Sequence, residues 1–185
     1  MAEGLEFRVD ASDKILARFG NQLAALGGGL AKTVMARALN HEGDKARTQV
    51  KRVLVKQTGI NYNLIDKAVS TYRAHQGKLS YTIQARGSET NLGLFNARAT
   101  QSGVSAAPWG MRRIFRSADG ERGSFLLPGT KLVFIRTGKA SHPIKPLFGP
   151  NIARELVRDE SKQAFSIITH SIAQRMAHEI ARELK

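Results

Sequence analysis

The fold of this chain is decided by residues 123–150, GSFLLPGTKLVFIRTGKASHPIKPLFGP. Two short apolar runs in this stretch are separated by Pro128-Gly129, a dipeptide typical of a tight turn. A basic loop follows, then Gly149-Pro150, and then a long helical pattern. The stretch therefore predicts a hairpin and a docking loop that lead into a helix, and nothing in it resembles a catalytic centre.

The hairpin extends into a predicted three-stranded meander. We expect its strands at residues 111–116, 124–127 and 131–137, with Asp119-Gly120 at the first turn. Connections this short force neighbouring strands to pair antiparallel. Apolar and polar residues alternate over residues 79–86, which predicts one more half-buried strand.

Helical periodicity marks both ends of the chain. We expect a helix over residues 12–26, a break at the three glycines that follow, and a second helix over residues 30–57. Asn61 or Asn63 is expected to cap a short third helix, and Asn151 the last one. The predicted class is α+β, with N-terminal helices, an antiparallel meander or barrel-like sheet, and a long C-terminal helix in a single domain over residues 1–185.

Residues 87–110 contain four glycines and little periodicity. A loop of this length inside a compact domain is usually functional or mobile. We interpret it as a flexible arm or insertion that orders against a partner.

Composition limits the classes of protein to consider. The 185 residues include 42% apolar and 6% aromatic residues, which suits one domain with a modest core. There is no cysteine, so disulfides and thiolate metal sites are excluded. The N-terminus lacks the apolar segment of a signal peptide, and no apolar run reaches membrane-spanning length. We therefore expect a soluble protein that stays in the cytoplasm where it is made.

The strongest compositional signal is positive charge. Lys and Arg number 29 against 15 Asp and Glu, and residues 97–145 alone carry nine basic and two acidic residues. The basic groups form a phosphate-binding surface, a solvated face or an interface to an acidic protein. The candidate contacts to an anionic partner or DNA are Lys45, Arg52, Lys56, Arg112, Arg113, Arg116, Arg136 and Lys139.

The residues that carry catalysis are poorly represented. The five histidines lack the spacing of a zinc site, and carboxylates are sparse in the strand region, with Asp119 and Glu121 at a turn. We predict no catalytic residues, no metal site and no cofactor.

Trp109 is the only tryptophan, and it is either a core side chain or an anchor in a subunit interface. The candidate interface residues are Trp109, Phe95, Phe125, Pro143, Phe148 and Pro150.

From about residue 30 the chain resembles the minor tail protein Z family of bacteriophages, the tail-completion proteins of long-tailed phages and prophages. The resemblance is carried by Gly123-Ser124-Phe125, by the strand ending Val133-Phe134-Ile135-Arg136, and by Pro143-Ile144 before Leu147-Phe148-Gly149-Pro150. AKTVMARALN and KARTQVKRVLVKQTG in the helical region also fit.

The resemblance implies a non-enzymatic structural protein of the virion, at the head-proximal end of the tail. It implies a homo-oligomeric ring, with a hexamer as the expected form, that completes the tail, allows it to join the head and positions DNA. The implied partners are a tail terminator, a head–tail connector, a tape-measure protein and packaged double-stranded DNA, with no membrane. A basic nucleic-acid-binding protein that acts outside a virion is the competing hypothesis, and an enzyme such as a nuclease is the third.

Overall fold

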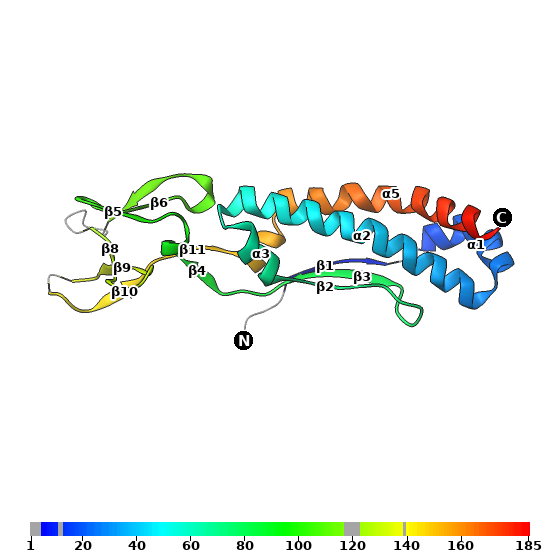
Figure 1. Ribbon diagram of the computed structural model, residues 1–185, viewed down its shortest axis with the longest axis horizontal. Helices are drawn as coiled ribbons and strands as arrows, with labels where there is room; N and C mark the ends of the chain where they lie inside the picture. The colour runs from blue at the N-terminus through cyan, green and yellow to red at the C-terminus, as the bar shows by residue number, and fades with distance from the viewer. Residues whose placement is uncertain (1–4, 11–12, 117–122, 139) are drawn as a thin grey trace.

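The computed structural model describes residues 5–10, 13–116, 123–138 and 140–185. The molecule is elongated, with long helices toward one end and short strands toward the other (Figure 1). We call the described residues between 92 and 151 the β end and the other described residues the helical end. The turn at Asp119-Gly120, Glu121 and Lys139 lie outside the described residues.

The three predicted N-terminal helices are confirmed to within about two residues at each boundary. Gly27, at φ 77° and ψ 153°, separates α1 from α2, a conformation that only glycine adopts readily. Asn61 caps α3 by accepting a hydrogen bond from the backbone N–H of Asn63. The helices are α1 (Asp13–Leu26), α2 (Gly28–Thr58), α3 (Tyr62–Ala68), α4 (Ile152–Leu156) and α5 (Asp159–Glu183), with 3₁₀ turns η1 (Leu92–Leu94) and η2 (Pro108–Gly110).

The strands pair antiparallel in four small sheets, ordered β1-β3-β2, β5-β6-β7, β10-β9-β8 and β11-β4. The α+β class is confirmed, and the described strands form no closed barrel. The strands are β1 (Leu5–Asp10), β2 (Val69–Tyr72), β3 (Ser80–Ala85), β4 (Glu89–Asn91), β5 (Arg98–Thr100), β6 (Gly103–Ala106), β7 (Arg113–Phe115), β8 (Phe125–Leu126), β9 (Val133–Arg136), β10 (Ile144–Pro146) and β11 (Phe148–Asn151).

Helices α2 and α5 lie side by side along the β1-β3-β2 sheet (Figure 1). Of the apolar residues at helical spacing on α2, Val34, Ala38, Val50 and Leu54 are buried, Val53 is half-buried and Leu30 is exposed. Residues four apart on α5, namely Ile172, Met176 and Ile180, bury the matching stripe. Helical periodicity therefore identifies the faces that meet in the core.

Gly43 lies in the middle of α2 without interrupting the helix, and it has a packing role there. A Cβ built on Gly43 would lie 2.4 Å from the ring of Tyr81 on β3. The Tyr81 hydroxyl donates to Asp44 Oδ1 at 2.9 Å, which holds the ring against the helix. The missing side chain thus lets the sheet approach α2 closely.

The predicted meander is partly wrong. Strands β8 and β9 form the expected hairpin, but β7 pairs with β6. Among the described residues, β7 is linked to the segment before β8 by an isolated bridge between Arg116 and Gly123 and by hydrogen bonds from Ser124 to the Phe115 carbonyl. The loop after β9 folds back as β10. Two strands outside the predicted meander, β6 before it and β10 after it, therefore pair with its strands.

The interpretation of residues 87–110 as an irregular loop is also wrong. This segment contains β4, β5 and β6, and it buries Leu92, Phe95, Val104 and Ala106 in the main core. Its strands are only three or four residues long, too short for alternation to be recognised in the sequence. Whether this segment contacts a partner stays a prediction.

Two further differences concern the termini. Residues Leu5–Asp10, for which no strand was predicted, form β1 at the edge of the first sheet. The Asn151 side chain caps α4, where it accepts from the N–H groups of Ala153 and Arg154, and the long helix α5 begins only at Asp159. The predicted C-terminal helix is therefore two helices.

A side chain fixes the β10-β9-β8 sheet to β4. Asn91 Oδ1 accepts from the N–H groups of Gly93 and Val133, both at 2.9 Å, and Asn91 Nδ2 donates to the Val133 carbonyl at 3.3 Å. These bonds connect β9 to the end of β4 without a strand ladder between them.

Replacing Gly43 by alanine tests the close contact between α2 and Tyr81. We expect Gly43→Ala to destabilise the protein by about 1–3 kcal/mol, because the new methyl group overlaps the aromatic ring. Urea denaturation gives the free energy of unfolding. Gly20→Ala is the matched control, since no atom lies within 4 Å of its Cβ position and an exposed helical alanine stabilises by about 0.5–1 kcal/mol. Equal stability of the two variants would contradict the packing role.

Candidate functional site

Several cations of α2 are paired with acidic residues within the chain. Lys45 donates to Glu42 at 3.0 Å. Arg47 and Lys51 both pair with Asp66 on α3, and the Lys51 side chain is buried rather than on an open face. The hydrogen bond and charge of Lys51 lower the pKa of Asp66 below its ordinary value.

Arg52 and Lys56 differ from their neighbours, because neither takes part in an ion pair within the described residues. Both are exposed and border a shallow hollow of about 430 Å³ beside Tyr62. Helix α2 therefore offers two of the three predicted cations to an anionic partner.

The predicted arginines of the β end remain available, and two of them are held over aromatic rings. The Arg113 guanidinium lies 5.4 Å from the ring centroid of Trp109 and 5.8 Å from that of Phe115. Arg136 lies 4.5 Å above Phe125. Cation–π contacts of this kind position a guanidinium without neutralising it.

The other two predicted arginines of this end are both exposed. Arg112 donates to the carbonyl of Asn96 and the hydroxyl of Ser105, both at 3.3 Å, so it is tied to its own sheet. Arg116 lies at the bridge to Gly123.

The structure brings together two of the predicted interface residues. Trp109 and Phe148 line one hollow of about 340 Å³ where the two ends of the molecule meet. Phe148 is exposed and Trp109 is half-buried. Charged side chains of both signs surround them, namely Glu89, Arg154, Glu155 and Arg158.

Phe95 and Pro150 were wrongly assigned to an interface, because both are buried within the chain. Phe95 belongs to the main core, and its ring closes on Gly149 so tightly that a Cβ there would lie 2.8 Å away. Phe125 is half-buried and packs against Phe134, while Pro143 is exposed.

Glu155, which sequence reasoning missed, joins three elements at this junction. Its buried carboxylate accepts from Gln57 at 2.8 Å and from the Trp109 indole at 3.4 Å, and it forms an ion pair with Arg158 at 3.2 Å. Trp109 has φ 55°, uncommon for a non-glycine residue, and this hydrogen bond helps to hold it there. Glu155 lies three residues after Ile152 and next to Leu156, on the apolar stripe of α4, which is the signal in the sequence.

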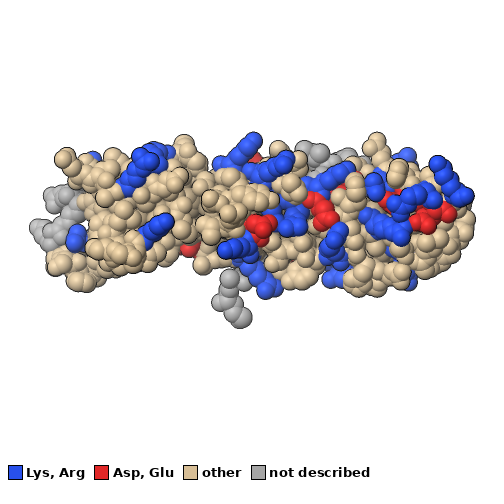
Figure 2. Space-filling model, in the orientation of Figure 1, with Lys and Arg blue, Asp and Glu red and all other residues tan. Residues whose placement is uncertain are grey.

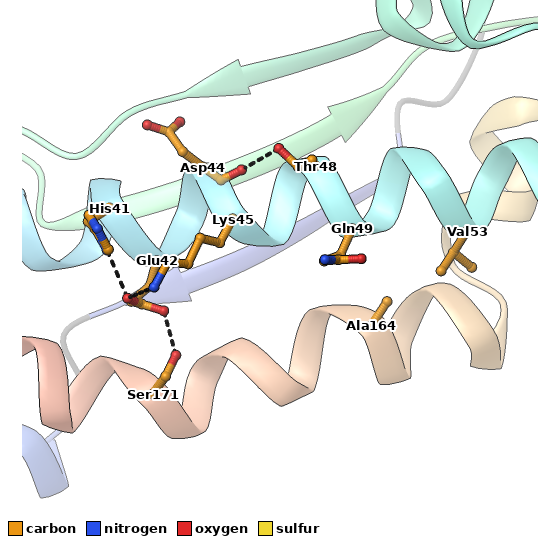
Figure 3. Close-up of a pocket in the computed structure, with 9 residues that line it drawn as sticks. All are labelled: His41, Glu42, Asp44, Lys45, Thr48, Gln49, Val53, Ala164 and Ser171. Carbon is orange, nitrogen blue, oxygen red and sulfur yellow. Dashed lines mark hydrogen bonds and ion pairs between the residues drawn. The ribbon is translucent and has the colours of Figure 1, made fainter.

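A second buried carboxylate lies in a groove of about 960 Å³ between α2 and α5 (Figure 3). Glu42 accepts from Ser171 at 2.5 Å, from His41 at 2.8 Å and from Lys45 at 3.0 Å. Burial raises the pKa of Glu42, but these hydrogen bonds outweigh it and the net shift is downward. Because its hydrogen bonds are made within the chain, we interpret Glu42 as a connection between the two helices.

Charge is distributed unevenly over the visible face of the molecule. Acidic and basic side chains intermingle over the helical end, whereas basic side chains lie without acidic ones toward the tip of the β end (Figure 2).

Among the described residues, no group of three His, Asp or Glu side chains is placed to hold a metal ion. None of the described helices has the length and apolar character needed to span a bilayer.

The chain matches no protein-family model, and searches of the curated proteins and of the solved structures find no significant match. Function is therefore argued from the residues and surfaces described above.

The Glu42 cluster predicts a dependence of stability on pH. The pKa of Glu42 in the folded protein lies below its ordinary value of 4.5, so its stabilising contribution is present above pH 4.5 and is lost as the pH falls below that value. We expect Glu42→Gln to lose less stability than the wild type over this range, measured by urea denaturation on both sides of pH 4.5. Glu160→Gln, at an exposed position of α5, should keep the wild-type dependence. Identical curves for wild type and Glu42→Gln would refute the assignment.

Proposed function

We propose that this chain is a structural tail-completion protein of a long-tailed phage or prophage. In this role it assembles as a homo-oligomeric ring, with a hexamer as the expected form, at the head-proximal end of the tail. The place in the virion comes from the resemblance of residues 123–150 and of the helical region to the minor tail protein Z family. No reaction is assigned to the chain.

The observation that carries the self-association is the exposed apolar surface of the β end. Nine large hydrophobic side chains are exposed among the described residues, and five of them lie in the β end. They are Leu94, Met111, Ile114, Leu132 and Phe148. Soluble monomers rarely gather apolar side chains in one region unless a partner covers them.

Open strand edges add to this support. Among the described strands, β5 and β10 are outermost in their sheets and have a paired neighbour on one side. Unpaired edges present backbone donors and acceptors to another chain. Copies arranged around a ring offer a regular way to cover such edges, and closure of the ring limits association to a fixed number of copies.

The hollow lined by Trp109 and Phe148 is the proposed contact for the next copy. It combines two aromatic side chains with a rim of both charge signs, the composition typical of an interface anchor. The further partners in this proposal are a tail terminator, a head–tail connector, a tape-measure protein and packaged double-stranded DNA.

A nucleic-acid-binding protein that acts outside a virion is the second candidate, favoured by the net charge of +14. Salt separates the two functions in part. Apolar contacts between copies persist at high salt, whereas binding to nucleic acid weakens as salt rises.

The proposed ring makes a direct prediction for the purified protein. Mass photometry and negative-stain electron microscopy should show closed rings, and Phe148→Glu should weaken association at least tenfold, because it places a charge at the contact. Leu184→Glu, which alters a similarly exposed side chain at the other end of the molecule, should leave the rings intact. A protein that is monomeric at every concentration would contradict self-association.

The virion role has its own test. Deleting the gene from the phage or prophage that carries it should leave tails unjoined to heads, and the wild-type gene supplied in trans should restore joining. Normal yields of infectious particles after the deletion would refute the role, whatever the protein does in isolation.

A further inference from the structure

We infer that the β end binds duplex DNA through the phosphate backbone, chiefly by Arg113, Arg116 and Arg136. This inference deepens the proposed function, on which its biological setting rests, because it names the part of the chain that meets packaged DNA. The binding itself requires neither a ring nor a virion, so it can be measured on the purified protein.

The first argument is the separation of charge along the molecule. Residues 92–151 contain nine basic and two acidic residues, and both acidic residues, Asp119 and Glu121, lie outside the described part of this segment. The described β end therefore carries seven cations and no anion. These cations are Arg98, Arg112, Arg113, Arg116, Lys131, Arg136 and Lys145.

In the helical end, by contrast, many charged side chains form ion pairs with one another. Each ion pair found among the described residues joins two residues of the helical end, as in Arg73–Asp44, Arg158–Glu155 and Arg175–Glu179. The cations of the β end have no such partners within the described residues. Positive charge at the β end therefore remains available to an external anion.

The second argument is that two of these arginines are already positioned. Arg113 lies over Trp109 and Phe115, and Arg136 lies over Phe125. Stacking restricts the side chain while the guanidinium keeps its charge, which lowers the entropy lost on binding. A guanidinium also donates two parallel hydrogen bonds to a phosphate, which an ammonium group does not.

Duplex DNA fits these cations better than a second copy of the chain or a single-stranded nucleic acid does. A second copy has no acidic region to offer, because the helical end also contains more basic than acidic residues. Single-stranded nucleic acid binds largely by stacking of bases on aromatic rings. Arginines already cover faces of Trp109, Phe115 and Phe125, so contact with the backbone is favoured over stacking.

An acidic protein is the remaining alternative. The seven cations are spread over two three-stranded sheets, β5-β6-β7 and β10-β9-β8, and the segments between their strands, instead of surrounding one pocket. A duplex presents one negative charge per about 1.7 Å of its length with no positive charge between them. Over residues 92–151, nine basic residues against two acidic ones match that repeat better than the mixed charges of a typical protein surface.

The test compares two triple variants in fluorescence anisotropy with a labelled duplex oligonucleotide over a series of salt concentrations. The variant Arg113→Gln/Arg116→Gln/Arg136→Gln should bind at least about tenfold more weakly, and the slope of log K against log salt should become shallower by about 2–3. The control Lys32→Gln/Lys67→Gln/Lys78→Gln removes the same charge from exposed lysines of the helical end, none of which forms an ion pair with a described residue. Its affinity should fall less than about threefold.

Three results would overturn the inference. Equal losses in the two triple variants would mean that net charge alone attracts DNA. Tighter binding of a single strand than of the duplex would exclude the backbone assignment, and competition by polyglutamate as effective as that by duplex would identify an acidic protein as the partner.

A second measurement avoids any dependence on the folding of the variants. Duplex DNA should protect Arg113 and Arg136 of the wild-type protein from phenylglyoxal, read by mass spectrometry, and full reactivity in the complex would refute the inference. Failure here is separable from failure of the proposed function. If rings form but do not bind DNA, this inference alone is refuted. If the protein binds DNA as a monomer, the proposed ring is refuted and this inference stands.

Discussion

One buried carboxylate joins three segments where the two ends of this molecule meet. Glu155 accepts hydrogen bonds from Gln57 near the end of α2 and from Trp109 in η2, and it forms an ion pair with Arg158 at the start of α5. A buried charge is costly unless polar groups surround it, so these three segments must stay together for the fold to be stable. The same carboxylate lies beside the hollow lined by Trp109 and Phe148. The proposed contact between copies thus lies beside a polar junction between the two ends.

The two ends differ in how their charged and apolar side chains are arranged. The helical end pairs its charges internally and packs long apolar stripes, as α2 and α5 do around Val34 and Met176. The β end has short strands, exposed apolar side chains and unpaired cations. Internal pairing suits a rigid support, whereas unpaired charge and uncovered apolar surface suit contact with other molecules.

Sequence predicted the helices well because periodicity over many turns averages out exceptions such as Gly43 inside α2. The hairpin of β8 and β9 was also predicted, since Pro128-Gly129 specifies its turn. Strands of three or four residues, such as β4 and β5, gave no usable pattern, and β4 pairs with the distant strand β11. Phe95 shows the same limit for the candidate site: an aromatic residue in a glycine-rich segment looked available, but the close approach of Gly149 buries it. The cation–π contacts of Arg113 and Arg136 likewise needed three-dimensional neighbours that spacing cannot supply.

The Asn91 side chain acts as a substitute peptide group. It presents a carbonyl oxygen to two backbone N–H groups and an amide N–H to the carbonyl of Val133, as a neighbouring strand would. Aspartate has the same shape but no donor, and leucine has neither group, so this position demands a primary amide of this length. The hydrogen bonds between β9 and the end of β4 are therefore encoded by a single side chain that no hydrophobic pattern would reveal.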